Sequence, residues 1–170
     1  MPEQRLLSAR MAGWLALAAA VALADQLTKQ LVLASLRYGE AVPVTPFFDI
    51  VLVYNPGAAF SFLANQPGWQ RWFFTGLAAV ICTWLTVLLR RHQHERLLPA
   101  AFVLIIGGAV GNVVDRLMHG AVVDFLHFYV GRFSWPAFNL ADSAITVGVA
   151  LMLWSSFRPH SHDPAKENHA

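Results

Sequence analysis

Four long apolar segments divide the chain, and each has roughly the length of a helix that crosses a lipid bilayer. They run over about 11–36, 72–89, 97–114 and 140–157. A helix needs about 20 mostly apolar residues to cross the hydrocarbon core of a membrane. We therefore predict an all-α membrane protein with four transmembrane helices.

The composition agrees with this prediction and argues against other classes of protein. Charged residues form only 13% of the 170 residues, whereas soluble domains contain about 25%. The formal net charge of +2 is small and dispersed, so we expect no nucleic-acid partner. Cys82 is the single cysteine, so an intramolecular disulfide is excluded. It lies in an apolar run, which favours a packing role.

The connections between the apolar segments predict a small sheet on one side of the membrane. The connection at about 37–71 contains VPVTPFFDIVLVYN, whose β-branched and aromatic residues predict one or two strands. We expect these strands to form a small extracytoplasmic β-rich cradle at the membrane surface. Residues 1–157 then form a single membrane-embedded domain, and 158–170 form a polar, disordered cytoplasmic tail.

The positions of the cations predict the orientation of the chain. Arg90, Arg91 and Arg96 lie in one very short connection, whereas the opposite side has fewer cations spread over two longer connections. Short loops rich in cations remain in the cytoplasm, so both termini are predicted to be cytoplasmic. The start of the chain also mimics a cleavable secretory signal, with the sequence ALA at 22–24, and an intact-mass measurement distinguishes the two interpretations.

Polar residues gather near the outer ends of the first, third and fourth segments and in the connection between the last two. They are Asp25, Lys29, Asn112, Asp115, Arg116, Asp124, Asn139 and Asp142. Charged residues in or beside a span are rare and usually functional. A purely structural network accounts for part of the set, because Asp25 and Lys29 stand one helical turn apart. Asp115 is expected to pair in the same way with its neighbour Arg116.

Two carboxylates, Asp124 and Asp142, have no such partner close in sequence. If they share a site at the apolar boundary, repulsion and desolvation leave one proton on the pair. One carboxylate then takes a proton from an attacking water, and the other protonates a carbonyl oxygen and helps an amine to leave. A proton or ion relay is the main alternative, although the inner halves of the segments carry almost no polar residues. A structural subunit of a membrane complex is a third interpretation.

Metal-dependent and nucleophilic chemistry are less well supported. No histidine lies at helical spacing from either acid, and His119 and His127 fall at unmatched offsets, so we expect no metal and no cofactor. Ser143 adjoins Asp142, but neighbouring side chains on a helix point about 100° apart.

Five blocks of sequence give a more specific indication. They are DQLTK at 25–29, YNPGAAFSFL at 54–63, GGAVGNVVDR at 107–116, VVDF at 122–125 and FNLADSAI at 138–145. In order and spacing these blocks resemble the bacterial lipoprotein signal peptidases, also called signal peptidase II, over roughly 11–157. The resemblance implies an aspartic endopeptidase that removes the signal peptide from prolipoproteins by cleaving before the diacylglyceryl-modified cysteine.

The resemblance also implies a role for each polar position. Asp124 and Asp142 would be the catalytic pair, and Asn55, Gly57, Asn112, Arg116 and Asn139 would bind substrate or support the pair. Asp25 and Lys29 would brace the first helix, and Asp115 would orient Arg116. The connection at 120–136 is a candidate to fold over the site, and small residues at 57–59 leave room for an extended substrate.

The same resemblance implies a setting and a set of partners. We expect a multi-pass protein of the bacterial inner membrane, with its active site near the periplasmic face. The expected partners are diacylglyceryl-modified prolipoproteins and the bilayer itself. Cyclic peptides of the globomycin type are expected inhibitors, and we expect the protein to be a monomer.

Overall fold

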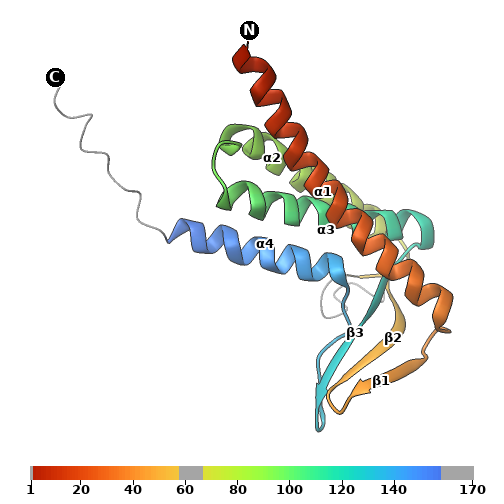
Figure 1. The fold of residues 1–170 in the computed structure, drawn as a ribbon. Helices are drawn as coiled ribbons and strands as arrows, with labels where there is room; N and C mark the ends of the chain where they lie inside the picture. Colours follow the sequence, from red (N-terminus) through yellow and green to blue (C-terminus); the bar gives the residue numbers. More distant parts are fainter. Residues whose placement is uncertain (1, 58–66, 158–170) are drawn as a thin grey trace.

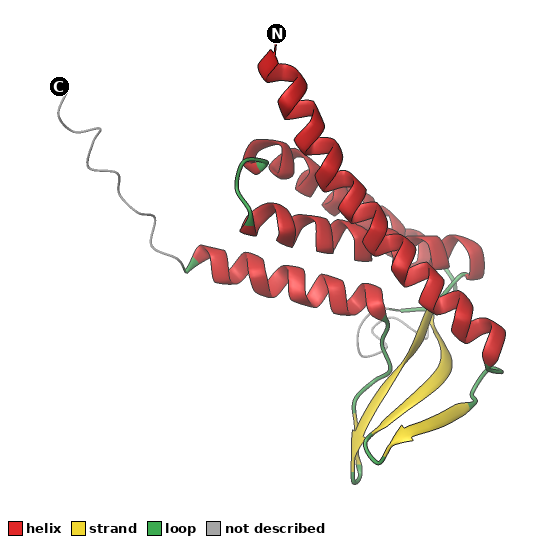
Figure 2. Cartoon of the chain, in the orientation of Figure 1, coloured by secondary structure: helices red, strands yellow, loops and turns green. Residues whose placement is uncertain are grey.

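The computed structural model describes residues 2–57 and 67–157, and the polar tail predicted at 158–170 lies outside these ranges. Within them the secondary structure is mostly helical, with one end of the helical part capped by a small sheet (Figures 1 and 2). The elements in order are α1 Pro2–Ser35, β1 Ala41–Thr45, β2 Phe48–Asn55, α2 Gln70–His92, α3 Leu97–His119, β3 Val122–Val130, β4 Phe133–Ser134 and α4 Leu140–Ser156.

Helix α3 is the centre of the helical part. It packs against α1, α2 and α4, and its middle residues Phe102, Val103 and Ile106 are buried. These side chains form a core with Ala18 of α1 and Leu85 of α2. Of the three long apolar helices, α3 has the largest buried share, as its central place among the others requires.

Two glycines of α3 allow its neighbours to come unusually close. A Cβ atom on Gly111 would collide with the carboxylate of Asp25, and one on Gly108 would collide with the backbone carbonyl of Ala141. Small residues let helix backbones approach each other in membrane proteins. These glycines therefore let α1 and α4 pack against α3 at the level of the polar residues.

Three of the described helices are long and apolar enough to cross a membrane, namely Ala9–Ser35, Gln70–His92 and Leu97–His119. Helix α4 is apolar but shorter, with 17 residues. Helix α1 continues through Asp25 without a break, and α3 extends beyond the predicted end at 114. The sequence thus placed these helices correctly, although it set some of their ends too early.

The sheet has four antiparallel strands in the order β1-β2-β3-β4. Strands β1 and β2 confirm the prediction from the 37–71 connection. Strand β3 pairs with β2 from Phe48 opposite Phe128 to Asn55 opposite Val122. The connection at 120–136, expected to be a loop that folds over the site, instead contains β3, because VVDFLHFYV is rich in β-branched and aromatic residues.

Candidate active site

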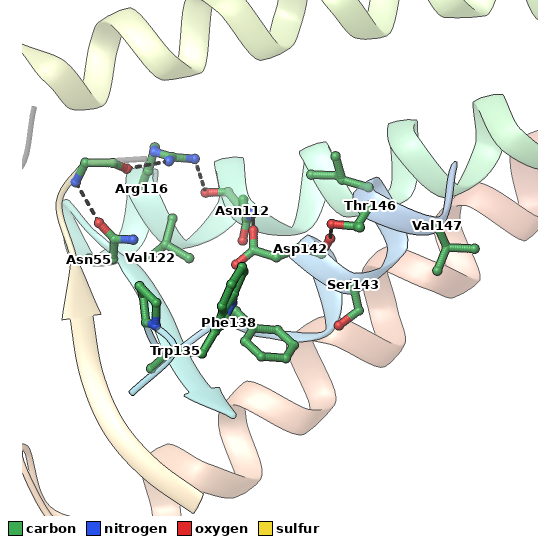
Figure 3. A pocket seen from close by; sticks show the side chains of 14 residues that line it. Asn55, Asn112, Arg116, Val122, Trp135, Phe138, Asp142, Ser143, Thr146 and Val147 are labelled. Carbon is green, nitrogen blue, oxygen red and sulfur yellow. Dashed lines mark hydrogen bonds between the residues drawn. The ribbon is translucent and has the colours of Figure 1, made fainter. Parts of the chain in front are cut away.

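The predicted polar residues meet where the helices join the sheet. The cluster contains Asp25 and Lys29 from α1, Asn55 from β2, Asn112, Asp115 and Arg116 from α3, Asp124 from β3, and Asn139 and Asp142 at the start of α4. Figure 3 shows one side of it, with Asn112 and Asp142 facing each other between α3 and α4. Residues from five separate elements therefore contribute to one site.

Lys29 is the centre of a buried ionic cluster. Its Nζ lies 2.8 Å from Asp25 Oδ2 and 2.7 Å from Asp115 Oδ2, and it donates to Asn112 Oδ1 at 3.0 Å. Lys29 and Asp25 are both fully buried. The ammonium has three hydrogens, so these three acceptors satisfy it, as a buried charge requires.

This cluster confirms one predicted pair and corrects another. Asp25 pairs with Lys29 as expected from their spacing. Asp115 pairs with Lys29 as well, and within the described ranges no ion pair joins it to Arg116. Side chains that adjoin on a helix point about 100° apart, so Asp115 reaches across to α1 while Arg116 turns elsewhere.

The two acids of the cluster also hold the segments that carry the Asp124–Asp142 pair. Asp25 Oδ1 accepts a hydrogen bond from the backbone N–H of Ala141 at 2.9 Å. Asp115 Oδ2 accepts one from the backbone N–H of Val123 at 3.0 Å. Each bonded amide lies one residue before a member of the pair. A single buried lysine thus anchors both acids through its two carboxylate partners.

Asn139 connects the two members of the pair directly. Its Nδ2 donates to Asp124 Oδ1 at 2.7 Å, and its Oδ1 accepts from the backbone N–H of Asp142 at 2.9 Å. The second bond is an N-cap of α4, in which an asparagine side chain satisfies a free amide of the first turn. The spacing of Asn139 and Asp142 in the sequence is therefore that of a helix cap and its third helical residue.

Asn112 contacts Asp142 from the other helix. Its Oδ1 faces Lys29, and its Nδ2 donates to Asp142 Oδ1 at 2.8 Å. Because an ammonium group can only donate, the oxygen of the Asn112 amide must face Lys29. The orientation of this amide is consequently fixed, with its N–H directed at Asp142.

Asp124 lies at the buried end of β3, where only 2% of its surface is exposed. Burial, and to a lesser degree the charge of Asp142, raises the pKa of Asp124 to about 7. Hydrogen bonds from Asn55 Nδ2 at 3.2 Å and from Asn139 partly offset this effect. Asp124 therefore retains a proton through much of the neutral range, as the member of a pair that shares one proton would.

Arg116 contacts the chain near the end of β2. Its Nη2 donates to the carbonyl of Gly57 at 3.0 Å, and the guanidinium lies 5.1 Å from the centre of the Phe74 ring. Asn55 Oδ1 accepts from the N–H of the same glycine at 3.0 Å. Arg116 and Asn55 thus hold Gly57 from both sides, whereas Ala58 and Ala59 of the same block lie outside the described residues.

A cavity of about 580 Å³ opens beside Asp142. Asn55, Gly57, Asn112 and Arg116 are among the residues that line it. Its other walls include Phe138, Ile145 and Val147, and Figure 3 shows Ser143, Thr146 and Val147 following Asp142 along α4. The cavity therefore has polar groups at the acid and an apolar wall along the helix, an arrangement typical of ligand sites.

Gln26 belongs to the cluster, and the sequence analysis did not single it out. Its Nε2 donates to Asp115 Oδ1 at 2.8 Å and to the carbonyl of Gly111 at 3.0 Å. Its position inside the DQLTK block is the only feature of the sequence that pointed to a role for Gln26 in the site. Within the described ranges, no three His, Cys, Asp or Glu side chains converge on a point where a metal ion could bind.

Comparison with known protein families determines the class of the chain. The family described as Signal peptidase (SPase) II matches residues 17–158. The chain belongs to the signal peptidase II family. The matched range contains the whole cluster from Asp25 to Asp142, and it confirms the resemblance carried by the five sequence blocks.

Individual members of the signal peptidase II family are similar over most of their length. A lipoprotein signal peptidase of Azoarcus sp. (strain BH72) is 69% identical over 161 residues, which cover 95% of this chain and 92% of that protein. A lipoprotein signal peptidase of Cupriavidus taiwanensis is 59% identical over 145 residues, covering 85% of this chain and 82% of the relative.

Two solved structures, each described as a bacterial membrane enzyme studied by the in meso method, share the fold. The first has a TM-score of 0.79 at 30% identity and covers 92% of this chain and 94% of its own. The second has a TM-score of 0.75 at 30% identity, and the match covers 88% of this chain and 95% of that structure's chain.

Proposed function

We propose that Asp124 and Asp142 are the catalytic pair with which this signal peptidase II removes signal peptides from prolipoproteins. Membership of the family establishes the class of reaction, an aspartic-type hydrolysis of a peptide bond. The observation that carries the assignment of residues is that Asn139 bonds the carboxylate of one acid and the backbone of the other. This shared partner brings two acids of distant sequence into one site.

Within this proposal the two acids have different tasks. Asp142 stands in the first turn of α4, where the helix dipole stabilises a negative charge, and it takes a proton from the attacking water. Asp124, whose raised pKa of about 7 leaves a fraction of it protonated at neutral pH, gives its proton to the carbonyl oxygen. As the tetrahedral intermediate collapses and the C–N bond breaks, Asp124 relays a proton from a hydroxyl to the departing amine. The proton on Asp142 then moves to Asp124, which restores the starting state.

The surrounding residues divide into substrate contacts and positioning residues. Asn55, Gly57, Asn112 and Arg116 line the cavity and are assigned to the substrate backbone. Asn139 is fully buried and is not among the residues that line this cavity, so its proposed role is to position the acids. Of the two roles predicted for Asn139, support of the pair is therefore the one proposed.

The scissile bond is proposed to be the one before the diacylglyceryl-modified cysteine. A signal peptide and a lipid chain both lie in the bilayer, so a site that cuts between them must stand at the membrane interface. The apolar wall of Ile145 and Val147 beside Asp142 supports this assignment. Burial of acyl chain there contributes about 0.8 kcal/mol per methylene group.

The proposed setting is the bacterial inner membrane, with residues 1–157 as one domain crossed by four helices and the site near the periplasmic face. Helix α4 is about 25 Å long at 1.5 Å per residue, close to the hydrocarbon thickness of about 30 Å. Arg10 donates to His94 Nδ1 at 2.7 Å, so Arg10 of α1 lies beside the α2–α3 connection that carries Arg96. Figure 1 places that connection at the end of the molecule opposite the sheet.

Labelling of single cysteines tests this orientation. An impermeant maleimide applied to cells with a permeabilised outer membrane is expected to label Phe133→Cys, which lies on the exposed β4. His94→Cys should react only after the inner membrane is opened. Labelling in the reverse pattern would place the sheet in the cytoplasm.

Mass spectrometry of a lipidated precursor incubated with the pure protein tests the catalytic pair. The wild-type protein is expected to release the signal peptide, and Asp124→Asn or Asp142→Asn should reduce turnover by at least about 10³-fold. Glu95→Gln in the α2–α3 connection is a matched control, because Glu95 is exposed and lies in neither cavity wall. Robust cleavage by either variant would remove the pair from the mechanism.

The proposal includes a monomer as the active form and inhibition by cyclic peptides of the globomycin type. Such a peptide combines an apolar surface with backbone amides, which suits the cavity beside Asp142. It is expected to compete with the substrate and to lose affinity in Val147→Phe. Mass measurement of the detergent-solubilised protein tests the monomer, and activity confined to a dimer fraction would contradict it.

A further inference from the structure

A second cavity lies on the other side of the catalytic pair. Its volume is about 630 Å³, within the range of about 300–1,000 Å³ that is typical of ligand pockets. Asp124 lines this cavity, whereas Asp142 lines the first one. Asn55 and the segment Trp135, Pro136 and Ala137 line both. The proposed scissile position therefore stands at the boundary between two cavities.

The walls of the two cavities differ in chemistry. The first follows α4 and presents Ile145 and Val147 below the acid. The second lies against β2 and β3, and its walls carry the phenol groups of Tyr38 and Tyr54 and the side chains of His127 and Ser134. A polypeptide that crosses the pair thus passes from an apolar wall at the helices to a hydrogen-bonding wall on the sheet.

We infer that the second cavity is the binding site for the first residues of the mature lipoprotein, the polar segment that follows the modified cysteine. This inference rests on the proposed function, because it takes Asp124 and Asp142 as the reacting groups. The signal peptide and the acyl chains are apolar and fit the first cavity, so the polar residues that follow the modified cysteine are assigned to the side of Asp124. The second cavity begins at Asp124 and has a polar wall, and both features suit an extended, hydrated peptide.

A hydrogen bond orders part of the polar wall. His127 Nε2 and Ser134 Oγ are 2.7 Å apart, which ties β3 to β4. This bond orients the imidazole and the hydroxyl group that a passing peptide would meet.

A second hydrolytic site is the competing explanation of these side chains, because serine, histidine and aspartate occur together. Asp49 Oδ2 lies 3.8 Å from His127 Nδ1, however, which is beyond the limit of a hydrogen bond. A Ser-His-Asp triad requires that bond to orient the imidazole. The geometry therefore favours a binding wall over a nucleophilic centre.

Two substrates that differ only after the modified cysteine test the inference. The short one ends at the modified cysteine as an amide, and the long one continues with five polar residues. Two net hydrogen bonds of about 0.5–1.5 kcal/mol each correspond to roughly a tenfold preference in kcat/KM for the long substrate. Equal kcat/KM values for the two substrates with the wild-type protein would overturn the inference.

Variants of the cavity locate the preference. Val53→Phe narrows the second cavity from β2, and Ser134→Tyr narrows it from the exposed strand β4. Both are expected to erase the ratio of long to short substrate. Val147→Phe in the first cavity should slow both substrates and keep the ratio. Val44→Phe, on β1 and outside both cavity walls, should change neither rate nor ratio.

The outcomes separate this inference from the proposed function. If Asp124→Asn abolishes cleavage of both substrates while Ser134→Tyr leaves the ratio intact, the catalytic pair stands and the second cavity does not bind the mature segment. If Asp124→Asn cleaves normally, the proposed function fails whatever the ratio. If Val53→Phe and Ser134→Tyr lose the preference for the long substrate while Val147→Phe keeps it, the second cavity is supported as the binding site.

Discussion

Lys29 donates to the side-chain oxygen of Asn112 at 3.0 Å and so directs the amide nitrogen of Asn112 toward Asp142. Lys29 is fully buried and cannot meet a substrate. Its influence on the site passes through the one amide that it orients and through the two carboxylates that it neutralises. The cation therefore belongs to the architecture of the acid pair although it takes no part in proton transfer.

Replacement of Asn112 by aspartate tests this orientation. Asn112→Asp still accepts from Lys29 but has no N–H for Asp142 and adds a like charge beside it. A hydrogen bond to a charged group contributes about 1.5–3 kcal/mol, so kcat should fall by roughly 10- to 150-fold. The melting temperature should also fall, because Asn112 is buried and the added carboxylate has no cation of its own. Cleavage at the wild-type rate would show that Asp142 does not depend on this donor.

Removal of the cation should affect stability most. Lys29→Met leaves Asp25 and Asp115 buried without a counter-charge, and breaking a buried pair in this way costs about 3–5 kcal/mol. The double variant with Asp25→Asn should recover part of the loss, because it removes one unpaired charge. Thermal unfolding in detergent measures both. A double variant no more stable than Lys29→Met would contradict the electrostatic explanation.

The sequence predicted the contacts within a helix better than those between elements. The pairing of Asp25 with Lys29 follows from their helical spacing, and the structure contains it. The pairing of Asp115 with Lys29 joins α3 to α1, and no spacing rule within one helix predicts such a contact. Arg116 is an equally plausible ion-pair partner from the sequence, but it bonds the carbonyl of Gly57 instead. Charge counting alone could not decide between the two cations.

The sheet shows the same limit. Strands β1 and β2 follow a proline-bounded run with clear β propensity, and the sequence predicted them. Strand β3 starts at Val122 in the VVDF block and continues to Val130. It was not predicted, although its β-branched and aromatic residues also favour a strand. The position of Asp124 depends on the pairing of β3 with β2, which places Asp124 opposite Val53. Register between distant strands is set by packing and is not visible in either strand alone.

The pH dependence of cleavage should report the proton on Asp124. Because burial and the nearby charge of Asp142 raise its pKa to about 7, kcat/KM is expected to fall as the pH rises above that value. A pH–rate profile measures this limb, whose apparent pKa belongs to the pair as a whole. A flat profile through pH 7 would exclude Asp124 as the proton donor.

The same shift predicts a slope in stability. Between about pH 4 and pH 7 the folded protein binds more protons at Asp124 than the unfolded chain does. Its contribution to the free energy of unfolding therefore decreases as the pH rises through this window and is constant above it. Asp124→Asn lacks the titrating group, so its melting temperature should decline less over the same range. Parallel curves for the two proteins would contradict a raised pKa at this position.

Replacement of Arg116 should reduce activity more than stability, whereas replacement of Lys29 should reduce stability most. In Arg116→Ala, Asp115 keeps both Lys29 and the amide of Val123, so no buried carboxylate loses its partner. The melting temperature is expected to fall less than in Lys29→Met. Activity should fall by about 10- to 100-fold, because Gly57 loses the donor that holds it and the cavity loses its cation.

Two further variants make the test of Arg116 specific. Arg116→Lys keeps the charge but lacks the planar group that reaches the carbonyl of Gly57, so it should recover activity only in part. Arg71→Ala removes an exposed arginine that lies over the Trp72 ring and should leave cleavage unchanged. If Arg116→Ala unfolded as readily as Lys29→Met, Arg116 would have to neutralise Asp115 after all, and the single-lysine anchor of both acids would be wrong.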